Sequence, residues 1–219
     1  RHLEEVGDEV LTSTDLDVRD ADAVRHWFTE VEPEVVFHLA ARSRVGESWQ
    51  RPSATFEVNA NGTLNVLDAA LSCEVPPRVV LVSASDVYGA VPERDLPVTE
   101  ASALAPISPL AASKIAAEYL GVQAWLGTHL PVVLVRPFNQ IGPGQASDFV
   151  VPALAQRIVH AVATGAREVS VGDLEARRDY TDVRDGARAL RMLAAAGVPG
   201  VAYNLCSGRA TKIGDIVEL

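Results

Sequence analysis

The chain has 219 residues, 48% hydrophobic and 22% charged, as in a globular protein with one sizeable core and room for a small second lobe. Its 19 Lys and Arg against 29 Asp and Glu give a net charge of −10, which argues against broad binding to nucleic acid or an anionic membrane. Two cysteines, Cys73 and Cys206, make neither a disulfide framework nor a metal-ligand spacing, and no apolar stretch reaches membrane-spanning length, so we expect a cytoplasmic protein without a metal site.

Hydrophobic periodicity predicts helices alternating with buried strands. Val24, Trp27, Phe28 and Val31 are spaced as on one face of a helix, with Asp20 as its N-cap. Short apolar runs predict strands at residues 9–11, 34–41, 78–82, 131–135, 169–171 and 203–205. Further helices are expected from Pro52 to Leu67 and over residues 110–126, 151–162, 182–196 and from 213 onward.

The stretch from Arg78 to Glu118 organises the chain. It reads RVVLVSASDVYG, then an acidic Pro-rich loop, then SPLAASKIAAEYL. An apolar strand that ends in small hydroxyl residues is how a parallel sheet brings a site to its C-terminal edge. The helix that follows carries Ser113 and Lys114 in its first turns, so the sequence predicts a functional site where this strand ends.

Together with HLAA at 38–41, VNANGT at 58–63, RPFNQIGPG at 136–144 and ARRDY at 176–180, this stretch resembles the extended short-chain dehydrogenase/reductase family over nearly the whole chain. The family comprises nucleotide-sugar epimerases, dehydratases and reductases. The resemblance implies an α/β fold, a Rossmann-type doubly wound parallel sheet with a small C-terminal substrate lobe. We expect a dinucleotide-binding domain over residues 1–138, and over 139–219 a mostly substrate-binding lobe whose elements interleave with the core.

The family resemblance also sets expectations for the two ends of the chain and for its partners. The first βα unit, which holds the family's glycine-rich pyrophosphate loop, is expected to be missing before Arg1, and the last helix to be cut at Leu219. The implied cofactor is NAD or NADP, and the implied substrate a nucleoside-diphosphate sugar. A homodimer is expected, with the helices through Asn59 and Ser113 at its interface.

The resemblance assigns binding roles to individual residues. The expected cofactor contacts are Asp17 and Val18 at the adenine, the turn of Leu39, Ala40 and Ala41, and Asn59, Ser83 and Lys114. The expected substrate contacts are Ser43, Asn139, Arg177 and Arg178, the last two because a guanidinium pairs bidentately with phosphate. A solvated acidic loop and a surface salt bridge are the alternatives for Asp17 and for the arginine pair. Residues 12–14, Thr-Ser-Thr, offer neither a ribose-binding acid nor a phosphate-binding Arg, which leaves NAD and NADP open.

Two catalytic positions of the family are occupied by apolar residues. In the family, a Tyr four residues before the helix Lys exchanges a proton with the sugar hydroxyl, and a Ser or Thr hydrogen-bonds the reacting oxygen. Leu110 stands at the Tyr position and Ala84 at the Ser/Thr position, whereas Lys114 is retained. Neither Leu110 nor Ala84 can transfer a proton.

Three explanations are open. Neighbours substitute, with Ser83 or Ser85 for the hydroxyl and Asp86, Tyr88 or a water for the proton, so that Lys114, Ser85 and Asp86 are the catalytic candidates. Alternatively, the protein is a pseudoenzyme that binds a dinucleotide or nucleotide sugar without turnover. Thirdly, both positions were engineered to trap a complex.

Three stretches resemble one branch of the family in particular. VGESW, RPFNQIGPGQ and LEARRDYTDVRD are most similar to GDP-mannose 4,6-dehydratases and GDP-4-keto-6-deoxymannose reductases. A single acidic residue beside Ala84, where the dehydratases carry two, favours a reductase over a dehydratase. A nucleotide-sugar 4,6-dehydratase or epimerase is the alternative.

Overall fold

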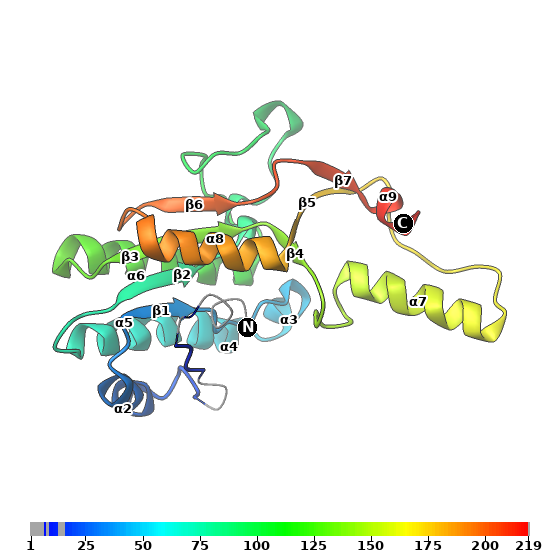
Figure 1. The fold of residues 1–219 in the computed structure, drawn as a ribbon. Helices are drawn as coiled ribbons and strands as arrows, with labels where there is room; N and C mark the ends of the chain where they lie inside the picture. The colour runs from blue at the N-terminus through cyan, green and yellow to red at the C-terminus, as the bar shows by residue number, and fades with distance from the viewer. Residues whose placement is uncertain (1–6, 8, 13–15, 219) are drawn as a thin grey trace. The chain divides into compact units, whose positions relative to one another are not determined.

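The computed structural model describes residues 7, 9–12 and 16–218, which divide into two compact units (Figure 1). Unit 1 comprises the chain up to Pro137 together with Arg188–Asn204, and unit 2 comprises Phe138–Ala187 and the chain from Leu205. The chain therefore leaves unit 1, returns to it, and leaves it again.

A four-stranded sheet forms the centre of unit 1. Its order is β1 (Val35–His38), β2 (Arg78–Val82), β3 (Val132–Pro137) and β6 (Ala202–Leu205). Strands β1, β2 and β3 are parallel, and His38, Leu81 and Leu134 lie side by side in register. The C-terminal ends of the three strands therefore share one edge of the sheet, as the Rossmann-type prediction requires.

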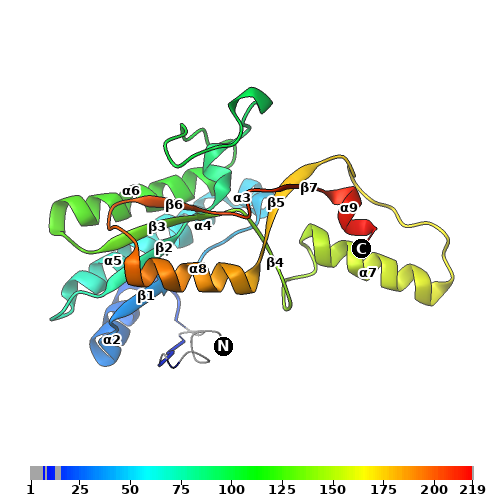
Figure 2. The same ribbon diagram turned by 45° about the horizontal axis from the view of Figure 1, so that its top comes forward.

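Helices α2 (Ala21–Val31), α5 (Gly62–Ser72) and α6 (Pro109–Thr128) pack around this sheet (Figure 1). The predicted cap is confirmed, because the Asp20 side chain accepts a hydrogen bond from the Ala23 amide. The apolar core between these elements includes Val24, Phe28, Val66, Leu67, Val79, Leu81, Leu130, Val132 and Leu134. Between β2 and α6, the loop over residues 89–108 extends away from the sheet in both views (Figures 1 and 2).

The helix predicted from Pro52 is interrupted. It forms α4 (Pro52–Phe56), a π-helical turn at Glu57–Asn61 and then α5, and it follows the short helix α3 (Val45–Gln50).

Asn59 lies in the π-helical turn, is 2% exposed, and joins two other segments. Its Oδ1 accepts from the Arg42 amide at 2.8 Å, while Nδ2 donates to the Arg42 carbonyl at 3.1 Å and to Ser113 Oγ at 2.9 Å. A π-bulge of this kind often occurs at functional sites, and here it ties the loop after β1 to α6.

Unit 2 contains a second, three-stranded sheet. Strand β5 (Arg177–Asp182) pairs in parallel with β4 (Asn139–Ile141) and antiparallel with β7 (Ala210–Lys212). The helices of this unit are α7 (Val150–Thr164), the start of α8 (Val183–Ala196) and α9 (Ile213–Val217).

One carboxylate holds the β6–β7 turn against β5. Asp179 accepts from the amide and hydroxyl of Ser207 at 2.8 and 2.9 Å and from the Gly208 amide at 2.7 Å. The backbone carbonyl of Asp179 accepts from Asn139 Nδ2 at 3.1 Å, which also connects β4. Asp179 therefore organises the second sheet.

The structure corrects several predicted elements. Residues 9–11 and 169–171 do not form the expected strands, because a segment of three residues is stable as a strand only when a neighbouring strand pairs with it. The RPFNQIGPG segment contains the end of β3 and the whole of strand β4, and the polar RRDYTD segment forms β5. The sequence of residues 1–8 also indicates the last turns of a helix that closes at Gly7, but these residues lie mostly outside those that the structure describes. None of the described helices is long and apolar enough to cross a membrane.

A buried ion pair connects α6 to β3. Arg136 and Glu118 are 6% and 2% exposed, and the guanidinium donates from Nε to Oε1 at 3.0 Å and from Nη2 to Oε2 at 2.7 Å. Arg136 Nη1 also donates to the Tyr88 hydroxyl at 3.0 Å and to the Glu100 carbonyl at 3.1 Å. Tyr88 in turn donates to Asn204 Oδ1 at 2.6 Å. The pair therefore fixes the end of β3, the turn after β2, the long loop and β6 against one another.

Replacing Glu118 with Ala is expected to lower the free energy of unfolding by about 3–5 kcal/mol, because it leaves the Arg136 charge buried without its partner. Chemical denaturation at pH 7 measures this change. Glu30→Ala, which removes an exposed His26–Glu30 pair, is the matched control and is expected to change stability by less than about 0.5 kcal/mol. Equal effects of the two substitutions would contradict the structural role of the buried pair.

Candidate functional site

Lys114 reaches the end of β2, one residue before Ser83. Lys114 Nζ donates to the Val82 carbonyl at 2.8 Å, and Lys114 and Ser83 are 7% and 4% exposed. Helix α6 reaches the sheet closely because Gly121, two turns further on, has no side chain: a Cβ there would lie 3.0 Å from both Leu81 and Leu134. The predicted site at the C-terminal edge of this strand thus contains a buried cation.

Two polar groups at this edge have unused hydrogen-bonding capacity. Ser83 Oγ is buried and has no hydrogen-bond partner in the described part of the chain. Lys114 Nζ carries three protons and donates one of them, to Val82. Because buried polar atoms are nearly always paired in folded proteins, these two groups fit a polar ligand such as a ribose or a sugar hydroxyl.

Burial controls the charge of Lys114. Desolvation lowers the pKa of Lys114 from 10.5 to about 8, against an opposing effect of the Glu118 carboxylate on the same helix. His38, on β1, is buried as expected of a packed core residue, and its Nε2 lies 2.9 Å from Thr63 Oγ1. Burial, and then the Lys114 charge, lower the pKa of His38 to about 4, so its ring is neutral at pH 7.

The two apolar replacements lie in the fold where the sequence predicts. Leu110 is 3% exposed and one turn before Lys114 on α6, so residue 110 faces the interior beside the lysine. Ala84 lies two residues after the end of β2 and directly precedes a 3₁₀ turn, η2 (Ser85–Tyr88). The site holds a lysine but no Tyr at position 110 and no hydroxyl at position 84.

The substitutes proposed for the missing groups differ in their surroundings. Ser85 is half-buried and Asp86 exposed, and the structure gives neither side chain a hydrogen-bond partner among residues 16–218. Tyr88 is 3% exposed, and its hydroxyl is already engaged by Asn204 and Arg136. The structure therefore favours Ser85 and Asp86 over Tyr88 as groups that reach a ligand.

The residues expected at the adenine end lie just before α2, where Asp17 is exposed and Val18 is buried. Asp17 is bound side chain to side chain by Arg19, and hydrogen bonds from Arg19 lower the Asp17 pKa to about 2. Val18 is 9% exposed, and its carbonyl accepts from Asn65 Nδ2 at 2.9 Å. The Val18 side chain packs directly against the backbone of Gly62. A Cβ at position 62 would lie 2.5 Å from Val18 Cγ2, so this close contact requires a glycine there.

The turn after β1 is open to solvent. Leu39 is 60% exposed, Ala40 is exposed and Ala41 half-buried, and Ser43 is exposed just beyond them. Asn59 has both amide protons and its oxygen engaged within the protein, so its expected cofactor contact stays a prediction beside a clear structural role. Of residues 12–14, which decide between NAD and NADP in the family, 13 and 14 lie outside the described residues.

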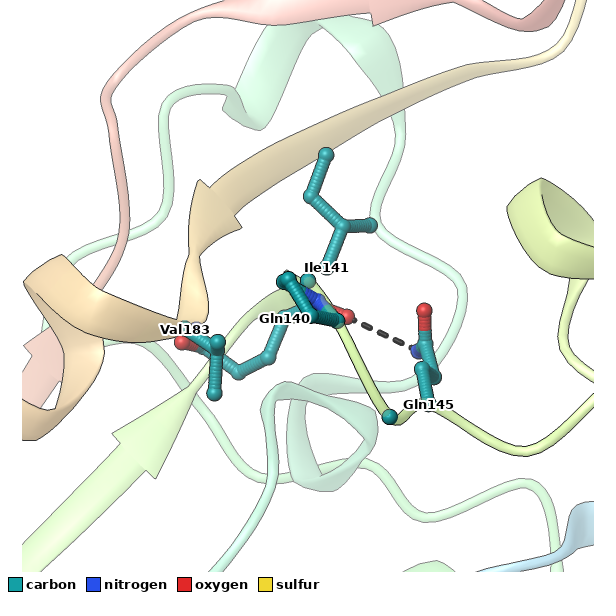
Figure 3. Close-up of a pocket in the computed structure, with 7 residues that line it drawn as sticks. Gln140, Ile141, Gln145 and Val183 are labelled. Atoms are coloured by element: carbon teal, nitrogen blue, oxygen red, sulfur yellow. Dashed lines mark hydrogen bonds between the residues drawn. The ribbon is translucent and has the colours of Figure 1, made fainter. Parts of the chain in front are cut away.

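The residues expected to bind substrate in unit 2 surround β4 and β5. Arg177 and Arg178 are exposed, and Arg178 Nη1 donates to the Arg177 carbonyl at 2.7 Å. Asn139 is exposed and bonds the Asp179 carbonyl. A pocket of about 240 Å³ lies in the same unit, and it is lined by residues 140–145 and Val183 (Figure 3). Gln145 Nε2 closes one side of it by donating to the Gln140 carbonyl at 2.9 Å (Figure 3).

Sequence reasoning did not identify Arg136, Glu118 or Asp179. An Arg at the end of an apolar strand and a Glu within a largely apolar helix face were the available signals, since charged residues are rarely fully buried unless they are paired. For Asp179, the one available signal was its position in the RRDY motif.

The parallel sheet, the AASK helix and the site at the end of β2 define a Rossmann-type protein of the extended short-chain dehydrogenase/reductase class. The sequence model described as "GDP-mannose 4,6 dehydratase" matches residues 1–219, and the chain belongs to that family.

Curated relatives agree with this membership. The chain is 37% identical over 204 residues to a GDP-6-deoxy-D-mannose reductase of Pseudomonas aeruginosa, a match that covers 93% of this chain and 67% of the relative. It is 33% identical to a dTDP-glucose 4,6-dehydratase of Escherichia coli, over 92% of this chain and 59% of that protein. The chain thus spans roughly three fifths to two thirds of the relatives it matches.

Solved structures show the same fold. The RMD protein of Pseudomonas aeruginosa, complexed with NADPH, is 34% identical and superposes with a TM-score of 0.89, covering 99% of this chain and 75% of that one. A UDP-glucose 4-epimerase of Thermotoga maritima with UDP-glucose is 27% identical, with a TM-score of 0.83 and coverage of 93% and 65%. The α/β, Rossmann-type prediction is confirmed.

Removing the Lys114 charge is expected to change how stability depends on pH. Because the folded-state pKa of Lys114 is about 8 and the ordinary value 10.5, the unfolded chain binds more protons between those pH values. The parent protein therefore gains stability as pH rises through this window, and the buried charge costs up to about 3 kcal/mol below pH 8. In Lys114→Met this dependence is absent.

The measurement is the unfolding free energy of Lys114→Met minus that of the parent, which should fall by about 3 kcal/mol between pH 7 and 10.5. Lys212→Met removes the other lysine of the sequence, which is paired with Glu175 on the surface of unit 2, and is expected to show no such change. A difference for Lys114→Met that is constant with pH would contradict the lowered pKa.

Proposed function

We propose that the protein is an NAD(P)-dependent enzyme that modifies a nucleoside-diphosphate sugar, and that it acts as a reductase of a 4-keto-6-deoxy sugar linked to GDP. The observation that carries the proposal is the buried Lys114 at the end of β2, beside the unpartnered hydroxyl of Ser83. The similarity to a GDP-6-deoxy-D-mannose reductase supports the choice of substrate. The single acidic residue after Ala84 also favours a reductase over the dehydratases and epimerases that match the chain.

The roles proposed for individual residues follow the resemblance to the family. In unit 1, Asp17, Val18, the turn of residues 39–41, Asn59 and Ser83 are the proposed cofactor contacts, and Lys114 donates to the nicotinamide ribose. In unit 2, Asn139, Arg177 and Arg178 are the proposed substrate contacts; the proposed substrate contact of unit 1 is Ser43. The nicotinamide, when bound, supplies the hydride for reduction. Ser85 and Asp86 lie beside Ala84 at the turn where the sugar would react.

The second candidate function is a binding protein without turnover. It is favoured by Leu110, a buried apolar side chain at the position from which the family's Tyr transfers a proton. A cytoplasmic homodimer is proposed in either case, with exposed Phe56, Leu64 and Tyr119 on α4, α5 and α6 as the surface between the two copies.

The deciding assay incubates the full-length protein with NADH or NADPH and a panel of GDP-, dTDP- and UDP-linked 4-keto-6-deoxy sugars, with Leu110→Tyr alongside. Turnover by the parent is expected, and Leu110→Tyr should raise kcat by about 10–100-fold. A correctly placed general acid typically contributes 10²–10⁴-fold, and the gain is smaller here because another group of the parent already supplies the proton. Leu110→Phe adds the ring without the hydroxyl and is the matched control, expected not to gain activity.

The outcomes distinguish the two candidates. Turnover only in Leu110→Tyr would support the binding protein and reject the reductase. Saturable binding without turnover by the parent or by either variant would also reject the reductase function.

Replacing Arg177 with Ala is expected to raise the Kd for a nucleoside diphosphate about tenfold, because one charge-assisted guanidinium–phosphate contact is lost. Isothermal titration calorimetry with GDP measures it. Arg94→Ala, which removes an exposed guanidinium from the η3 turn (Glu93–Asp95) of unit 1, is the control and should leave the Kd unchanged. Equal Kd values for Arg177→Ala and the parent would remove Arg177 from the site.

A further inference from the structure

Lys114 has both the protons and the position to act as an acid. Its Nζ donates one N–H to the Val82 carbonyl, and the structure assigns the other two to no atom of the described residues. Val82 is the last residue of β2, and the catalytic turn of residues 83–86 follows it directly. The remaining N–H groups are therefore available at the end of the strand where the sugar is proposed to react.

The groups around Lys114 leave it as the proton carrier. From β1, His38 is neutral at pH 7 and in contact with Thr63. From α6, Glu118 is taken up by the bidentate contact with Arg136 of β3, so its carboxylate cannot hold the lysine proton. From η2, Asp86 is exposed to solvent. Leu110, one turn away, offers only methyl groups.

We propose that Lys114 itself donates the proton to the carbonyl oxygen when the sugar ketone is reduced, and thereby replaces the hydroxyl that position 110 lacks. The inference rests on the proposed reductase function and deepens it, since it names the group that completes the reaction.

The step balances with the groups already named. Reduction of a ketone consumes one hydride and one proton: a C–H bond forms at the carbonyl carbon with the hydride of the reduced nicotinamide. The N–H bond of Lys114 breaks, an O–H bond forms on the former carbonyl oxygen, and the lysine is left as a neutral amine. The amine regains its proton from solvent before the next turnover.

The electrostatics of the site agree with this role. Burial brings the Lys114 pKa down to about 8, close to the pH at which the protein would operate, where a general acid is most effective. A lysine responds to burial in this way, whereas an arginine stays charged at any such pH. The apolar side chain of Leu110 contributes to the burial that a Tyr hydroxyl would have relieved.

The first measurement needs no turnover. The sequence contains two lysines, Lys114 and Lys212, so selectively ¹³C,¹⁵N-labelled lysine gives signals that Lys212→Arg assigns. Titration of the apoprotein by NMR is expected to show a pKa near 8 for the Lys114 amine, well below the ordinary value of a lysine.

The second measurement is the pH dependence of reduction at saturating substrate. If the protonated amine is the acid, kcat falls tenfold per pH unit above the pKa that NMR assigns to Lys114 in the complex. Lys114→Arg keeps the charge and the N–H donors but cannot release a proton, so kcat should fall at least 100-fold while the Kd for the reduced cofactor stays within about threefold. Lys212→Arg should match the parent in both.

Each outcome decides the proposal. A break in kcat that follows the NMR pKa, with loss of turnover but not of cofactor binding in Lys114→Arg, supports it. A pH profile without that break, or a break that Asp86→Asn abolishes, overturns it and leaves the reductase function intact, with the proton coming from another group. The NMR pKa and the parent's pH profile still decide if Lys114→Arg does not fold. No turnover by the parent on any sugar overturns the reductase function, and the proton transfer with it.

Discussion

The bidentate contact between Arg136 and Glu118 is the constraint on which the arrangement of unit 1 depends. Two charges that are almost completely removed from water are tolerated only when each satisfies the other, and here the remaining guanidinium N–H groups also find oxygen partners. Burial opposes the positive charge, but the hydrogen bonds with Glu118 and Tyr88 outweigh it and raise the Arg136 pKa. Segments far apart in sequence therefore meet at one point: α6, β3, the turn after β2, the long loop and β6.

The same pair shapes the chemistry one turn away. Lys114 and Glu118 are four residues apart on α6, a spacing at which they would ordinarily form an ion pair. Because Arg136 occupies the carboxylate, Lys114 has one acceptor among the described residues, the Val82 carbonyl, and burial dominates its pKa. A structural contact thus leaves a lysine that can change its charge near neutral pH, beside a residue, Leu110, that cannot exchange a proton at all.

Strong local patterns made part of the fold predictable. Strand β2 begins and ends at the predicted residues, and α6 and the Asp20 cap agree with the sequence within a residue or two, because apolar runs and capping side chains act over a few neighbouring residues. The π-helical turn at Asn59 was not predictable, since it depends on Arg42 and Ser113, 17 and 54 residues away. Strand β5 was missed because its residues are polar and it is extended by pairing with β4 and β7.

The sequence by itself determined the family motifs, the parallel sheet, the retained lysine and the two apolar residues at the family's acid/base positions, because each is a matter of residue type at a given spacing. Only the tertiary structure decided what those residues experience. Burial, the loss of a carboxylate partner to Arg136 and the unpartnered hydroxyl of Ser83 all arise from contacts between distant segments. A pKa and a free hydrogen-bonding valence are properties of such surroundings, and no local pattern of residues encodes them.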